Sequence, residues 1–130
     1  MAKIARTPFN GARIITASIS SDKAIIQKET GYTYFVNAQG AISINLAYTS
    51  GGSYHKLILK EDSAGDITLT FSAVVGLLIS DNSGVSVVEG TGTTITIPSG
   101  AKAGTYIDLI CDGSKWYANG MSASAAFTIS

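Results

Sequence analysis

The sequence predicts an all-β fold in which antiparallel strands form a sandwich or a barrel. Short runs rich in Ile, Val, Thr and Tyr alternate between apolar and polar residues, as half-buried strands do. Turn-forming residues separate these runs at short intervals. Strong helix formers are few and nowhere form a long stretch. At 130 residues, 45% of them hydrophobic, the chain fits one domain with a single core.

The first 13 residues differ from the rest and are predicted to form an extended arm. They contain no acidic residue, since the first is Asp22, and Pro8 interrupts any regular period. The positive charges of the arm are Lys3, Arg6 and Arg13. Such an arm either frays in solution or docks on an acidic neighbour. Residues 14–130 are assigned to the single β domain.

Two runs show the clearest strand periodicity. Residues 41–46 place Ile42, Ile44 and Leu46 on one face, and residues 66–71 do the same with Ile67, Leu69 and Phe71. In residues 105–111 the shared face carries Ile107, Leu109 and Cys111. The other expected strands cover residues 14–19, 32–36, 57–59, 94–97, 116–117 and 127–129.

Turns complete the fold prediction. Asp112-Gly113, between residues 105–111 and 115–119, is the strongest hairpin signal in the chain. Further turns are expected at residues 37–40, 50–52, 63–66 and 81–84. Because strands do not alternate with helical segments, a parallel sheet is not expected.

The sequence contains few residues that could act as a nucleophile or bind a metal ion. His55 is the single histidine and Cys111 the single cysteine, so a structural zinc site cannot form within one chain. Cys111 shares a face with Ile107 and Leu109, which predicts a core position. His55 precedes a strand and is expected at the surface or an interface. We therefore predict no enzymatic activity, no metal and no cofactor.

The acidic residues raise two further possibilities, calcium binding and glycoside hydrolysis. Glu61, Asp62 and Asp66 flank a turn and could bind calcium, as could residues 81–84. Asp and Gly are also common in β-turns for backbone reasons alone. Glycoside hydrolysis requires a positioned pair of carboxylates, and the nine acidic residues are spread over turns without a distinguished pair.

Aromatic residues raise the possibility of a binding platform. Tyr54, Trp116 and Tyr117 are the candidates for a surface that would bind a sugar; the alternative is packing in the core and at its rim. Binding of single-stranded nucleic acid would need basic residues around the rings, and Lys115 beside Trp116 is an isolated case. Nucleic acid is therefore not an expected partner.

Charge and hydropathy indicate the kind of partner and compartment. Nine basic residues balance nine acidic ones, so no global field attracts nucleic acid or a membrane, and little self-repulsion opposes association. No run approaches 18 apolar residues, and the N-terminus lacks the apolar segment of a signal peptide. The expectation is synthesis in a cytoplasm, no membrane partner, and some surface buried against another protein.

Residues 95–120 resemble a segment that recurs in virion proteins of tailed bacteriophages. The shared pattern is an Ile/Leu-rich strand ending in Pro98 and Gly100, a Gly-containing loop, an apolar strand, Asp112-Gly113, and then Trp116-Tyr117. Proteins with this segment include capsid decoration (cement) proteins, head fibres and tail-fibre modules. The resemblance implies a jelly-roll-like β-sandwich, often assembled as a homotrimer on the virion surface, and brings no catalytic residues with it.

Within that group, a decoration protein fits the sequence best, because neither a coiled coil nor the repetitive shaft of a fibre is visible. The resemblance then implies that the chain is made in the host cytoplasm, binds the major capsid protein and stabilises the head. Lys3, Arg6 and Arg13 would meet acidic capsid groups, and Phe9 would anchor the arm in a pocket. The alternative is a receptor- or carbohydrate-binding module of a head or tail fibre.

Overall fold

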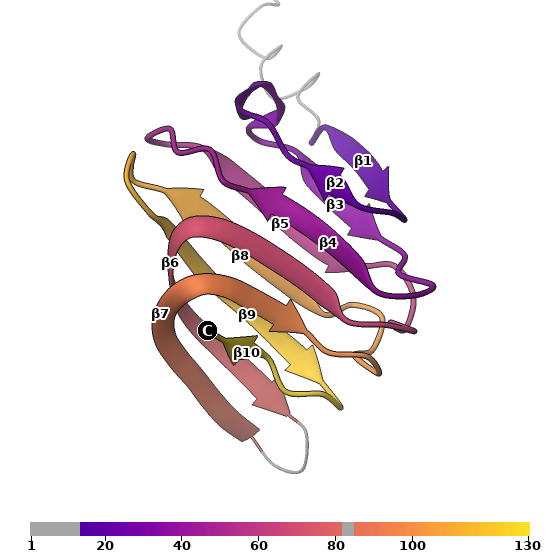
Figure 1. The fold of residues 1–130 in the computed structure, drawn as a ribbon. Coiled ribbons are helices and arrows are strands. Elements are labelled where there is room, and N and C mark those ends of the chain that lie inside the picture. Colours follow the sequence, from indigo (N-terminus) through magenta and orange to yellow (C-terminus); the bar gives the residue numbers. More distant parts are fainter. Residues whose placement is uncertain (1–13, 82–84) are drawn as a thin grey trace, which may run out of the picture.

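The computed structural model describes residues 14–81 and 85–130 (Figure 1). The proposed arm, with Lys3, Arg6, Phe9 and Arg13, lies outside the described residues, as does the centre of the turn at 81–84. The strands are β1 (Thr16–Ile19), β2 (Lys23–Ala24), β3 (Thr33–Val36), β4 (Ile42–Leu46), β5 (Tyr54–Leu59), β6 (Ile67–Asp81), β7 (Val85–Ile97), β8 (Tyr106–Cys111), β9 (Trp116–Ala123) and β10 (Thr128–Ile129), with one 3-10 turn, η1 (Gln27–Glu29).

The all-β prediction is confirmed, and the described strands join into one nearly closed, barrel-like sheet. The prediction of antiparallel pairing is wrong for much of it. Five of the nine strand pairings are parallel. In the first half of the chain, β1, β3 and β5 pair in parallel, and so do β2, β4 and β6.

The parallel pairs arise because the chain alternates between the two sides of the barrel. A parallel pair needs a crossover, which is usually a helix. Here a strand on the opposite side serves as the crossover, so that no helix is required. In Figure 1, β4 and the first half of β6 lie in front of β5 and β8. The prediction of antiparallel pairing rested on the absence of helical segments between the strands, and crossovers made by strands leave no such signal in the sequence.

The long hairpin of β6 and β7 connects the two sides. Residues 67–71 of β6 pair with β4, the register then shifts between Thr70 and Val74, and residues 74–81 pair with β9. Figure 1 shows both strands bending at their middle and continuing from the front of the barrel to its back. Residues 72–81 and 85–93 were not predicted as strands. The signal was available, because β-branched and apolar runs flank the turn at 81–84.

The hairpin predicted at Asp112-Gly113 is confirmed. β8 and β9 pair antiparallel, with Cys111 opposite Trp116. The Asp112 carboxylate accepts hydrogen bonds from the backbone N–H groups of Ser114 (2.8 Å) and Lys115 (2.9 Å). Gly113 adopts a φ of 104°, in the left-handed region that glycine tolerates. This local chemistry sets the loop and thereby the register of both strands.

The core lies between the two sides of the barrel and has the composition that periodicity predicts. Ile42, Ile44 and Leu46 alternate with exposed neighbours. The other two predicted inward-facing triplets, Ile67/Leu69/Phe71 and Ile107/Leu109/Cys111, are also buried. Residues from the described strands on both sides form one hydrophobic cluster.

Gly120 should not tolerate a side chain. It pairs with Ile107 across the β8–β9 ladder, and a Cβ there would clash with the Tyr106 carbonyl oxygen, a backbone atom that cannot rotate away. We expect Gly120→Ala to lower the free energy of unfolding by about 1–3 kcal/mol, as overpacked core sites do. Urea unfolding measures this change. Gly90→Ala is the matched control, because its Cβ would meet no atom within 4 Å, and an equal loss in both variants would contradict the clash.

Candidate functional site

The back of the barrel carries a broad surface on five neighbouring strands. Alternate residues of β5, β8, β9, β6 and β7 align across the sheet in three rows and point away from the core. We call this surface the apolar face. Its rows are Tyr54–Ile110–Tyr117–Val75–Thr91, Lys56–Asp108–Asn119–Leu77–Glu89 and Ile58–Tyr106–Met121–Ile79–Val87.

Large apolar side chains on this face are exposed. Leu77 is 55%, Val87 58% and Met121 47% exposed, and Ile79 and Ile110 are exposed as well. Met121, Ile79 and Val87 are neighbours across β9, β6 and β7, and Leu77 lies two residues from Ile79 on the same face, so these four side chains form a patch. Ile110 lies in another row, between Tyr54 and Tyr117. Contiguous exposed apolar surface of this kind marks an interaction site.

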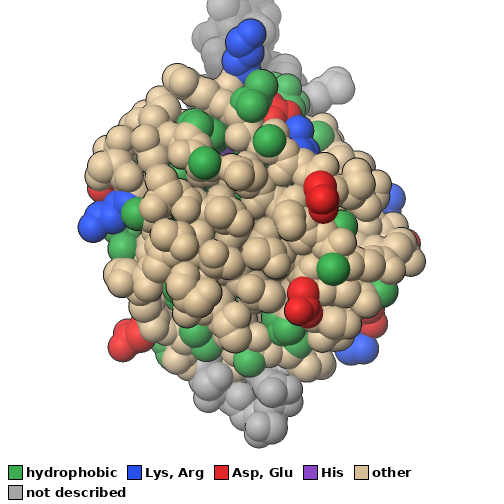
Figure 2. Space-filling view, viewed as in Figure 1, with side chains coloured by type: hydrophobic (Ala, Val, Ile, Leu, Met, Phe, Trp, Pro, Cys, Tyr) green, Lys and Arg blue, Asp and Glu red, His purple; other side chains and the backbone are tan. Residues whose placement is uncertain are grey.

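The opposite side of the barrel has a different surface. There the cross-strand neighbours of β4, β6 and β7 are Ser43, Thr68 and Thr96 in one row and Asn45, Thr70 and Thr94 in the next. Figure 2 views the molecule from this side and shows mostly uncharged surface with isolated charged and hydrophobic side chains. The two outward surfaces therefore differ in chemistry, and the apolar face is the one suited to burial against a partner.

Polar groups at one end of the apolar face fix the aromatic rings. The Tyr54 hydroxyl donates to Asp108 Oδ1 (3.0 Å), and Lys56 Nζ lies 3.8 Å from the same oxygen and 4.8 Å from the centre of the Tyr106 ring. The Tyr117 hydroxyl donates to Asp112 Oδ2 (2.9 Å). The N–H groups of Lys115 and Ser114, together with this hydroxyl, hold the pKa of Asp112 well below its usual range.

Two of the three predicted platform residues lie together, and the third does not. Tyr54 and Tyr117 share a row, with Ile110 between them, and are 39% and 38% exposed. Trp116 is fully buried, so its proposed place in a surface platform is wrong. Successive residues of a strand point to opposite faces, and Trp116 and Tyr117 therefore cannot share one.

Trp116 instead belongs to a buried aromatic cluster. Its Nε1–H donates to the Tyr48 carbonyl oxygen (2.9 Å), and its ring packs against those of Tyr48, His55 and Phe71 at centroid separations of 5.3, 5.8 and 6.2 Å. Cys111, opposite Trp116 in the hairpin, is buried as predicted. This cluster joins β5, β6, β9 and the loop after β4.

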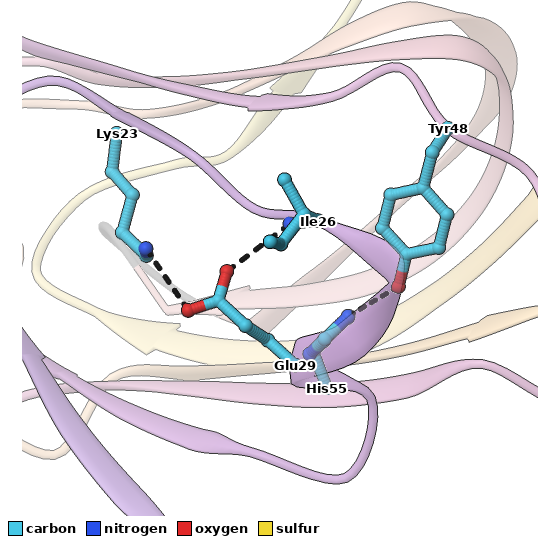
Figure 3. Close-up of polar contacts among 5 residues, drawn as sticks. All are labelled: Lys23, Ile26, Glu29, Tyr48 and His55. Carbon is cyan, nitrogen blue, oxygen red and sulfur yellow. Dashed lines mark hydrogen bonds and ion pairs between the residues drawn. The ribbon is translucent and has the colours of Figure 1, made fainter.

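The prediction that His55 lies at the surface or an interface is wrong. His55 is fully buried, because its register opposite Leu109 turns it inward together with Leu57. Its Nε2 lies 2.6 Å from the Tyr48 hydroxyl (Figure 3), and its Nδ1 has no hydrogen-bond partner in the described structure. Burial lowers the pKa of His55 to about 4, and the Glu29 carboxylate offsets this only in part. The imidazole is therefore neutral at pH 7.

Glu29 is the acidic residue whose charge acts on His55. Figure 3 shows its carboxylate between Lys23 Nζ (3.1 Å) and the backbone N–H of Ile26 (3.1 Å). Burial alone would raise the pKa of Glu29, but the Ile26 N–H and Lys23 outweigh it and lower the pKa. The buried phenol of Tyr34 has its pKa raised, by burial first and then by the Glu29 charge. These contacts anchor η1 to β2.

Turn carboxylates that could have bound calcium serve the backbone instead. Asp62 accepts the Ala103 N–H (2.9 Å) and lies 3.0 Å from Lys102 Nζ, and Asp66 accepts the Ser99 N–H (2.9 Å). These bonds tie the turn before β6 to the loop after β7. Within residues 14–81 and 85–130, no group of three or more His, Cys, Asp or Glu side chains could hold a metal ion.

Comparisons with known proteins do not identify a family for this chain. No protein-family model matches the sequence, and a search of curated proteins found no match. In the described part of the chain, no helix has the length and apolar character needed to cross a membrane.

Proposed function

We propose that this chain is a non-enzymatic structural protein of a bacteriophage virion, a decoration protein that binds the outer surface of the capsid and stabilises the head. The observation that carries the proposal is the apolar face, a wide surface suited to protein contact. The resemblance of residues 95–120 supplies the class of particle. In this proposal the barrel-like sheet is a variant of the jelly-roll sandwich that the resemblance implies.

The proposed partner is the major capsid protein. Burying Leu77, Ile79 and Met121 against it would supply the binding energy, at roughly 25 cal/mol for each Å² of apolar surface removed from water. The charged residues of the middle row, Lys56, Asp108 and Glu89, would set orientation more than affinity. Repeated contacts over the particle would reinforce one another through effective concentration.

The remaining parts of the proposal concern assembly and location. A homotrimer, which the resemblance implies, suits a local three-fold position of a capsid. The basic residues of the arm and Phe9 would add a second contact with acidic capsid groups. The protein would be made in the host cytoplasm and act on the virion surface, with neither nucleic acid nor membrane as partner.

A non-catalytic role agrees with the positions of the two residues most suited to nucleophilic or base chemistry. Cys111 lies in the core, and His55 is neutral and fully buried against Tyr48. A nucleophile or general base must reach a substrate, and its pKa should lie near the working pH. Neither side chain can reach a substrate from its buried position, and the pKa of His55, about 4, lies well below neutral pH.

Capsid binding should depend on the apolar face. We expect Leu77→Glu and Met121→Glu each to weaken binding to purified expanded capsids by at least about tenfold, because a charge would be buried without a partner. Co-sedimentation with capsids measures the binding. Ala24→Glu, which adds the same charge opposite Asn45 on the other side of the barrel, is the control and should bind normally. Failure of the unmodified chain to bind, or normal binding by both face variants, would overturn the proposal.

A second candidate function rests on the row Tyr54–Ile110–Tyr117. Two half-exposed phenol rings there are hydrogen-bonded to Asp108 and Asp112, which places carboxylate acceptors beside apolar ring faces. Rings beside hydrogen-bonding groups are what a carbohydrate-binding module of a fibre would offer a sugar. A glycan-array signal that disappears in Tyr117→Ala while capsid binding is absent would favour this candidate over decoration.

A further inference from the structure

One long strand edge of the barrel is open. β7 pairs with β6 along its length, but β10 contacts it only opposite Ile95 and Thr96. Ser130 extends this contact to Thr93 and Thr94. Residues 85–91 of β7 therefore have a strand on one side only within the described structure, which leaves a seven-residue edge with free backbone donors and acceptors.

This edge lacks the features by which proteins usually block strand pairing. Edge strands are usually protected because they are short, because they carry Lys or Pro, or because a β-bulge distorts them. The other two ends of the strand order fit that rule, since β1 has four residues and β2 has two, one of them Lys23. Residues 85–91 contain neither Lys nor Pro, and Glu89 is their one charged residue. The β6–β7 register shift lies between Thr70 and Val74, away from this segment.

We propose that residues 85–91 of β7 pair antiparallel with the same residues of a second copy of this chain, about a two-fold axis at Val88. A second copy of the chain suits this edge because the segment 85–91 can pair with itself. A strand that pairs with itself antiparallel keeps its outward residues on one face, and the contact closes as a dimer without leaving a free edge. The balanced net charge of the chain offers little repulsion to oppose it.

The register follows from the sequence of the edge. With the axis at Val88, all seven free residues pair, Val85 stands opposite Thr91, and Val87 stands opposite Glu89 of the second copy. An axis at Glu89 would instead place two carboxylates directly opposite each other, which is unfavourable. An axis at Val87 would pair only five of the free residues. The register at Val88 avoids both penalties.

The joined sheet would make the apolar faces of two copies continuous across β7. The inference stands on the open edge and does not depend on the proposed capsid function. It gives a dimer, whereas the trimer implied by the resemblance would need a different contact. A trimer in solution would therefore overturn this inference and support the trimer of the proposed function, whereas the capsid-binding assay tests the proposed decoration role without testing the dimer.

Charge swaps at positions 87 and 89 test the contact and its register together, with mass measured by light scattering across a dilution series of the full chain. The unmodified chain should be a dimer. Val87→Glu, which places like charges opposite each other twice in the dimer, should raise the dissociation constant about tenfold. Val87→Lys should keep the dimer, and so should the double variant Val87→Glu with Glu89→Lys, because opposite charges then pair.

Met121→Glu is the matched control, since it adds the same charge to the apolar face two strands from the edge and should leave the mass unchanged. Hydrogen exchange of the unmodified chain provides a readout without a variant: amides of residues 85–91 should exchange more slowly as concentration rises. A monomer or trimer at every soluble concentration would overturn the inference. A dimer whose 85–91 amides show no concentration dependence, or a dimer equally stable in Val87→Glu, would overturn it as well.

Discussion

Replacing Trp116 with alanine should lower the free energy of unfolding by about 3–5 kcal/mol, the usual range for removing a large buried aromatic side chain. Trp116 is fully buried and contacts rings from β5, β6 and the loop after β4. Its loss would leave a cavity and remove the hydrogen bond to the Tyr48 carbonyl. Denaturant unfolding followed by circular dichroism measures the change.

Tyr117→Ala is the matched control for Trp116→Ala. It removes the neighbouring aromatic residue from the opposite face of the same strand, where the ring is half-exposed. A surface change of this kind should cost no more than about 1 kcal/mol. Equal effects of the two substitutions would contradict the assignment of Trp116 to the core and reopen its proposed role in a platform.

Acidification should destabilise the fold through His55. The pKa of His55 is about 4 in the folded chain, below its ordinary value of 6.5. Between these values the unfolded chain binds more protons than the folded chain, so stability falls as pH falls. The full stability is present above pH 6.5. About 2 kcal/mol should be lost by pH 5, and about 3 kcal/mol by pH 4.

The physical cause is that a protonated His55 would carry a buried charge and a second N–H donor. Nδ1 has no acceptor in the described structure, and the Tyr48 hydroxyl faces only Nε2. Urea unfolding at pH 7 and pH 5 measures the difference, and the His55→Gln variant should show a much smaller one. If the unmodified chain is as stable at pH 5 as at pH 7, or if the variant keeps the full pH dependence, the assignment to His55 is wrong.

Local patterns predicted much of the fold. The alternation of residues 41–46, 66–71 and 105–111 identified inward-facing side chains that are buried in the structure, because period two is a property of the strand itself. The Asp112-Gly113 hairpin was predictable for the same reason, since its loop is held by contacts among neighbouring residues.

Long-range pairing was not predictable from those patterns. The partner of β3 depends on where the chain returns after β4, and a half-buried strand looks the same in a parallel and an antiparallel ladder. His55 was misplaced because its inward direction is set by its register opposite Leu109, more than 50 residues away. Trp116 was assigned ambiguously because an aromatic residue suits a core and a binding surface equally.

The candidate site shows the same division between local and long-range information. Tyr54 and Tyr117 were predicted as surface aromatics, and they do share a row. The apolar face takes six of its fifteen row residues, including Leu77, Ile79 and Val87, from residues 75–79 and 87–91, which were not predicted as strands. Its existence depends on β6 pairing with β9, a contact that no local pattern encodes.

The alternation of the chain between the two sides of the barrel has a consequence for how the protein folds. Most strands pair with a strand that is not next in sequence, and the Trp116–Tyr48 hydrogen bond spans 68 residues. Loop closure must therefore precede most of the favourable contacts, which slows folding. Because β8 and β9 complete the sheet between β5 and β6, a chain emerging from the ribosome cannot close its core until β9 has been synthesised.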